Sequence, residues 1–192
     1  MLAAVARRIS NAIGFDDAPF DRSHRGDVGL VGVVFSGTRL DGVVSARVRR
    51  DGANSTARMI ELVQCSKFCG HVRAVLLQGI AVAGFNVVDI FALERALGVP
   101  VLVVARRLPD LAAIRRALSR AGRGAERKWR LIERAGVMEP LRGVFVQRVG
   151  LSLSEAGELL ASTTLHGRLP EPLRVAHLVA GGFATGTSRG RA

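Results

Sequence analysis

The amino-acid sequence predicts an α/β protein with a mixed β-sheet and helices on both faces. Two observations lead to this class: apolar runs of strand length come first, and helical and strand patterns alternate after them. The 192 residues are 48% hydrophobic, which is enough to bury the core of one domain. We therefore expect residues 1–192 to form a single domain.

The first three predicted strands form a meander. Residues 9–15 and 28–35 are apolar runs of strand length, and residues 43–50 alternate apolar with polar or small side chains. A Ser-Gly-Thr turn signal at 36–38 precedes the third of these strands. This pattern is typical of a hairpin with one face in water.

Helices alternate with strands in the rest of the chain. The further predicted strands are 72–77, 100–105 and 144–147, and the predicted helices are 57–68, 86–97, 110–121, 125–135, 152–165 and 170–182. A meander followed by alternating helices and parallel strands is the ribonuclease-H-like arrangement. From about residue 183 to 192 we expect a flexible basic tail.

The charge of the chain favours a polyanionic partner. Its 28 basic residues exceed its 16 acidic residues by 12, and all of the basic residues except Lys67 and Lys128 are arginines. A GC-rich genome favours arginine over lysine, but it does not explain the excess of base over acid. The planar arginine side chain donates two parallel hydrogen bonds to phosphate, so we expect contact with a DNA or RNA backbone.

Seven arginines are candidates for this contact. They lie on the third predicted strand, after the strand at 100–105, and on the helix that follows: Arg47, Arg49, Arg106, Arg107, Arg115, Arg116 and Arg120. Aromatic residues make up only 5% of the chain, so backbone contact is a better expectation than stacking of bases on exposed rings.

The sequence also predicts the subcellular localisation of the protein. The chain has no apolar run of membrane-spanning length, and its N-terminus is apolar first and basic second, the reverse of a secretion signal. We therefore expect a cytoplasmic protein, and the oligomeric state stays open. Cys65 and Cys69, four residues apart in a predicted helix, are expected to be small buried side chains.

Acidic residues mark a candidate catalytic site. In this arrangement the ends of the first, third and fourth strands converge, and metal-dependent phosphodiester hydrolysis needs carboxylates there. The sequence places Asp16 and Asp17 at the first point, Asp51 at the second and Gln78 at the third. We expect Asp16 and Asp51 to be catalytic and to bind Mg²⁺ or Mn²⁺ with Gln78 and Asp17. The alternative is that both acidic segments are simple turn signals.

Asp89 is a further candidate ligand. It could replace the missing third acid if the first turn of the predicted helix 86–97 points back to the edge of the sheet. The simpler interpretation is that Asn86 caps this helix and that Asp89 complements its dipole. Similarly, Glu171 is expected to suit the first turn of the last helix, and His177 to be a packed helix residue.

Four segments resemble endonuclease V. They are Gly14-Phe15-Asp16-Asp17, Leu77-Gln78-Gly79-Ile80-Ala81, the strand at 98–105 and the segment 167–178 before and within the last helix. The chain resembles more closely an uncharacterised archaeal family related to endonuclease V, through residues 16–20, 84–90 and 188–192. The resemblance implies a ribonuclease-H-like fold and a Mg²⁺-dependent nuclease ancestry.

The chain departs from the endonuclease V pattern at three points. Gln78 stands at the third acid, Leu151 stands where a histidine is expected, and the Tyr-Ile-Pro wedge that separates bases has no counterpart in a chain without tyrosine. We therefore expect a nucleic-acid-binding protein with an altered, weakened metal site. The alternatives are an active Mg²⁺- or Mn²⁺-dependent nuclease that uses Gln78 or Asp89, and an assembly or anion-binding protein without a nucleic-acid role.

Overall fold

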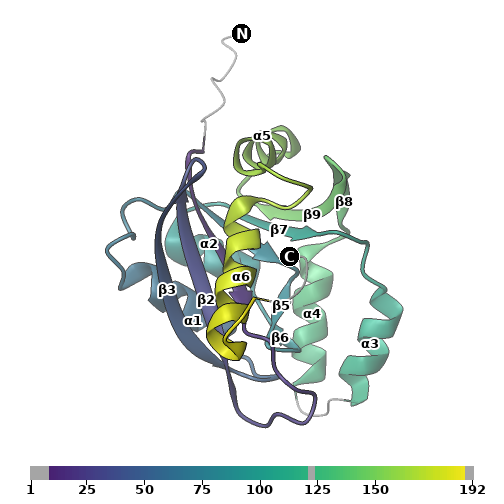
Figure 1. Cartoon of the computed structure of the whole chain (residues 1–192). Helices are drawn as coiled ribbons and strands as arrows, with labels where there is room; N and C mark the ends of the chain where they lie inside the picture. The colour runs from purple at the N-terminus through teal and green to yellow at the C-terminus, as the bar shows by residue number, and fades with distance from the viewer. Residues whose placement is uncertain (1–8, 121–123, 189–192) are drawn as a thin grey trace.

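A seven-stranded mixed sheet forms the centre of the protein in this computed structural model, which describes residues 9–120 and 124–188 (Figure 1). Its order is β3-β2-β1-β4-β7-β9-β8. The strands are β1 (Asn11–Asp17), β2 (Asp27–Ser36), β3 (Arg39–Arg49), β4 (Ala74–Gln78), β7 (Val101–Ala105), β8 (Glu139–Leu141) and β9 (Val144–Val149). Strands β1, β4 and β7 are parallel, and every other neighbouring pair is antiparallel.

Six helices and a small hairpin complete the described chain. They are α1 (Ser55–Gln64), α2 (Ile90–Leu97), α3 (Leu111–Arg120), α4 (Ala125–Ala135), α5 (Leu153–Thr163), α6 (Glu171–Thr185) and the strands β5 (Ala81–Val82) and β6 (Asn86–Val87). Within the described residues, no helix is both long and apolar enough to cross a bilayer.

The alternation of side chains divides the core between the two faces of the sheet. In β1, Ala12 joins a cluster with α5 and the start of α6, whereas Ile13 and Phe15 join a cluster with α1 and α2. Helices therefore cover both faces, as the sequence predicts (Figure 1). This parity decides which way each residue at the carboxyl end of β1 points.

The structure corrects several expected boundaries. The first strand runs to Asp17, so Asp16 and Asp17 end a strand instead of forming a turn. The predicted helix 86–97 begins at Ile90, because residues 86–87 pair as β6. Periodicity missed β5, β6 and β8, which have only two or three residues each.

The structure also bears on two smaller features, and the expectation for the cysteines was wrong. Cys65 and Cys69 are free and exposed, because α1 ends at Gln64 and leaves both outside the helix. Helix α6 continues to Thr185, beyond the expected helix end at 182, and residues 189–192 of the expected tail lie outside the described residues.

Candidate metal and nucleic-acid site

Helix α6 lies against β1 at the end of the strand that carries the first acid. A Cβ atom on Gly14 would lie 2.5 Å from the backbone carbon and oxygen of Pro172, so only glycine allows this approach. Asp16, two residues on, points to the same face of the sheet, and its Oδ2 lies 2.8 Å from Nδ1 of His177. The close packing therefore holds an imidazole beside a carboxylate whose side chain is only 12% exposed.

The approach at Gly14 gives the first testable prediction. Gly14→Ala should lower the free energy of unfolding by about 3 kcal/mol, because neither backbone can move away cheaply. In thermal unfolding this corresponds to a loss of roughly 6–12 °C for a chain of this size. Gly29→Ala is the control, since its Cβ would meet only the Ala18 Cβ at 3.4 Å. Equal melting temperatures for the two variants would contradict the packing argument.

Gln78 is the neighbour of Asp16 in the sheet. Strands β1 and β4 are parallel and pair Phe15 with Leu77, so the next residue on each strand is adjacent to the other and points to the face of α6. The Gln78 Oε1 atom is buried and accepts no hydrogen bond from the described residues. A buried acceptor without a donor is uncommon, and a cation is one way to satisfy it.

Asp16 and Asp17 are consecutive carboxylates at the end of β1, and they interact electrostatically. Burial raises the pKa of Asp16, and the hydrogen bond with His177 opposes this rise. Burial, together with the charge of Asp16, raises the pKa of Asp17 to about 6, while the backbone amide of Ala83 lowers it. Both carboxylates are thus held in surroundings that disfavour their negative charge.

Asp51 lies across the Ala83 loop from Asp17. Its Oδ1 accepts a hydrogen bond of 2.8 Å from the Phe85 amide, its Oδ2 lies 3.1 Å from Nε of Arg50, and its own amide donates to the Ala83 carbonyl at 2.9 Å. Asp51 and Ala83 both have a positive φ, of 51° and 47°, which is strained for residues with a side chain. The structure thus joins Asp17 and Asp51 through Ala83, while the Asp51 carboxylate already has an amide and an arginine as partners.

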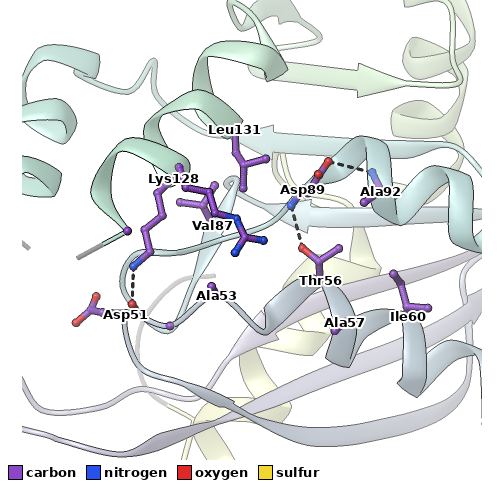
Figure 2. A pocket seen from close by; sticks show the side chains of 13 residues that line it. Asp51, Ala53, Thr56, Ala57, Ile60, Val87, Asp89, Ala92, Lys128 and Leu131 are labelled. Carbon is purple, nitrogen blue, oxygen red and sulfur yellow. Dashed lines mark hydrogen bonds between the residues drawn. The ribbon is translucent and has the colours of Figure 1, made fainter. Parts of the chain in front are cut away.

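A cavity of about 480 Å³ opens beside Asp51 (Figure 2). It lies between the starts of α1, α2 and α4, and its lining consists of Asp51, Gly52, Ala53, Thr56, Ala57, Ile60, Val87, Asp89, Ala92, Gly124, Arg127, Lys128 and Leu131. Lys128 is buried and donates to the Asp51 carbonyl, and burial lowers the pKa of its ammonium group. The lining of the cavity combines apolar side chains with two cations, Arg127 and Lys128.

Asp89 lines the same cavity, but its carboxylate has other partners. Oδ1 accepts hydrogen bonds from the Phe91 and Ala92 amides at 3.1 and 2.9 Å, and so caps α2 (Figure 2). The expected cap, Asn86, instead lies in β6, where its side chain accepts from the Ser55 amide at 3.1 Å and donates to the Arg49 carbonyl at 2.9 Å. Asn86 therefore ties β6 to the β3–α1 loop.

The seven candidate arginines are all exposed and lie in two groups. Arg47 and Arg49 lie on β3, beside Asp27, and the other five lie on the β7–α3 loop and on α3. Because β3 and β7 lie on opposite sides of β1 and β4 in the sheet, these groups flank the carboxylates. Arg115 also stacks on the Trp129 ring, with 5.1 Å to its centre.

The oxygen atoms at this edge suit Mg²⁺ or Mn²⁺. Among residues 9–120 and 124–188 no three His, Cys, Asp or Glu side chains form a group that could hold a metal. Mg²⁺ is commonly bound by one or two carboxylates plus waters, however, and Asp16, Asp17 and the unsatisfied oxygen of Gln78 offer that set. The donor chemistry therefore fits a hard divalent cation.

Sequence reasoning missed two residues of this region. His177 was expected to pack within its helix, yet it meets Asp16 across 161 residues of chain, and no local pattern reveals such a contact. Lys128 lies in an arginine-rich helix and was not selected. The one signal that distinguished it is that lysine is rare among the basic residues of this chain. Glu171 does lie in the first turn of α6, but it is also buried and paired with Arg174 at 2.6 Å.

Comparison with known proteins identifies the family. The family model "Endonuclease dU" matches residues 8–184. A UPF0215 protein of Deinococcus radiodurans is 57% identical over 96% of this chain and 94% of its own length, and one of Methanothermobacter thermautotrophicus is 42% identical over 94% and 90%. Homologues therefore occur in archaea as well as in Deinococcus.

Solved structures show the same fold. A protein of unknown function from Archaeoglobus fulgidus superposes with a TM-score of 0.85 at 33% identity, covering 91% of this chain and 98% of its own. Human endonuclease V superposes with a TM-score of 0.57 at 19% identity, covering 92% and 85%, which confirms the ribonuclease-H-like fold. The chain belongs to the endonuclease dU family, a family related to endonuclease V.

Proposed function

We propose that this protein is a divalent-metal-dependent endonuclease that cuts DNA containing deoxyuridine. The observation that carries the proposal is the meeting of Asp16, Asp17 and Gln78 at the ends of two neighbouring strands, where two carboxylates of raised pKa lie near an unsatisfied amide oxygen. The substrate class comes from the name of the family. An endonuclease V of Ciona intestinalis, similar in fold, has been crystallised with inosine-containing DNA.

Each part of the site has a role in this proposal. Asp16, Asp17 and Gln78 would hold Mg²⁺ or Mn²⁺, which would activate a water and neutralise charge on the leaving oxygen. His177 holds Asp16 in position through the 2.8 Å contact. Asp51 would serve as a further acid across Ala83, provided that it exchanges Arg50 for the ion.

The cavity beside Asp51 suits an extrahelical nucleotide. Its apolar side chains and its volume match those of small-molecule sites, and enzymes that recognise a base inside duplex DNA commonly turn it out of the stack. Arg127, which lines the cavity, would bind the phosphate of the same nucleotide. Recognition of uracil would thus take place next to the carboxylates.

A substrate panel tests the proposal. With Mg²⁺ or Mn²⁺ the protein should cut a duplex with one deoxyuridine at least about tenfold faster than the undamaged duplex, and EDTA should abolish cleavage. Ala92→Phe, which fills the cavity, should remove this preference, whereas Ala112→Phe on the exposed face of α3 should not. Equal rates of the wild-type protein on both duplexes would overturn the assignment to deoxyuridine. A preference that survives in Ala92→Phe would overturn the role of the cavity.

A second function, binding of nucleic acid without cleavage, is favoured by the ion pair between Arg50 and Asp51 and by an amide at the third acid position. It predicts salt-dependent binding to DNA or RNA through the two arginine groups, with no metal-dependent product. The same panel separates the two functions, because only the endonuclease yields cut strands.

A further inference from the structure

Helix α6 extends beyond the end of the strand on which it packs. Its contacts with β1 proceed in the same order along both elements, from Gly14 with Pro172 to Asp16 with His177, so the helix and the strand run in the same direction. Strand β1 ends at Asp17, but α6 continues to Thr185, about 12 Å past His177. Figure 1 shows these last turns at the same end of the molecule as the β1–β2 connection.

Phe183 lies on this extending part, on the stripe of the helix that faces the core. It follows Ala176 and Ala180 at helical spacing, and both alanines are buried at 1% exposure or less. Phe183 is nevertheless 91% exposed. It is the only aromatic residue among the large exposed hydrophobic side chains of the described chain.

The surroundings of Phe183 favour nucleic acid over a protein partner. Its neighbours Ala184 and Thr185 are small, so the described residues next to it add little to an apolar patch of the kind that binds proteins. The β1–β2 loop at the same end carries the exposed Arg22 and Arg25 and is held to Arg50, which donates to the Arg22 carbonyl at 2.6 Å. An exposed flat ring at the same end of the molecule as exposed cations matches the bases and phosphates of a DNA strand.

We propose that Phe183 stacks on a base of the DNA strand next to the scissile phosphate. This inference rests on the proposed endonuclease function and adds a contact to it. The ring replaces the neighbouring base of the stack, so the contact tolerates any sequence.

Binding measurements in a cleavage-deficient Asp16→Asn background test this contact. The probe is a deoxyuridine duplex with 2-aminopurine at each position flanking the uracil. Phe183→Ala should weaken binding roughly 5- to 150-fold, and Phe183→Trp should restore it to within about threefold. Because no phosphate contact is lost, the slope of log affinity against log salt should not change. One 2-aminopurine position should lose its ring-dependent fluorescence change in the alanine variant.

Controls separate this inference from the proposed function. Val137→Ala changes another exposed side chain, 79% exposed and next to the edge strand β8, and should leave affinity unchanged. Thermal unfolding of Phe183→Ala should match the parent, since the ring packs on little. If the wild-type protein cleaves but Phe183→Ala binds within twofold of the parent, stacking is overturned and the endonuclease stands. If wild type binds no DNA, both are overturned.

Discussion

Asp16→Asn should lower the rate of metal-dependent cleavage of a deoxyuridine duplex by at least roughly 10³-fold. A ligand that helps to neutralise charge in the transition state is worth several kcal/mol, and about 4 kcal/mol corresponds to three orders of magnitude. The change removes the carboxylate that lies beside both His177 and Gln78. Single-turnover cleavage with Mg²⁺ and with Mn²⁺ measures the effect.

The fold should survive this substitution. The Asp16 side chain is 12% exposed and burial raises its pKa, so replacing the carboxylate with a neutral amide removes a charge that the surroundings disfavour. Asp27→Asn, at a side chain 48% exposed, is the matched control and should cleave at the wild-type rate. Equal residual activity in wild type and Asp16→Asn would identify a contaminating nuclease and contradict the proposed site.

Asp17→Asn should make the protein more stable above pH 6. The pKa of Asp17 is about 6 in the folded protein against 3.8 for the ordinary side chain. The folded state therefore holds its proton more tightly than the unfolded state does, and stability falls as the pH rises from about 4 through 6 and is constant above. At about 1.4 kcal/mol for each pKa unit, the loss amounts to roughly 3 kcal/mol. The asparagine side chain cannot ionise, so the variant should not lose this stability as the pH rises.

Urea unfolding at pH 4.5, 6 and 8 measures this difference. The wild-type and Asp17→Asn curves should agree near pH 4 and diverge toward pH 8, whereas Asp27→Asn should follow the wild type. Mg²⁺ should stabilise the wild type at pH 8, because a cation offsets the two close carboxylates, and should have less effect on Asp17→Asn. A variant that loses stability at pH 8 would show that the carboxylate is needed for folding.

The carboxylates of Asp16 and Asp17 thus lower the stability of the folded protein at the position where the proposed activity needs them. Such an arrangement is common at active sites, where groups are placed for chemistry at a cost in stability. The strained backbone at Asp51 and Ala83 lies next to the same strand end. The hydrogen bond from the Asp51 amide to the Ala83 carbonyl holds the loop whose Ala83 amide donates to the Asp17 carboxylate. The expected gain in the stability of Asp17→Asn above pH 6 measures the cost of placing this carboxylate there.

Much of the fold could be predicted from local patterns. The apolar runs of β2 and β7 and the helical periods of α3 to α6 are long enough to be read without any contact information. The hairpin β5–β6 was missed because two-residue strands carry no period, and β8 because it has three residues. Position at the strand ends was also enough to name Asp16, Asp17, Asp51 and Gln78 as one candidate group, since the ends of neighbouring strands converge.

The sequence by itself determined the class of the fold, the excess of positive charge and the residues at the ends of the strands, because these depend on composition and on short-range periodicity. Only the tertiary structure decided the partners of those residues. Strand register brings Gln78 to Asp16, close packing at Gly14 brings His177 to the same carboxylate, and the placement of the last turns of α6 leaves Phe183 exposed. Each of these depends on elements far apart in the chain, and contacts over such distances have no period for a sequence to display.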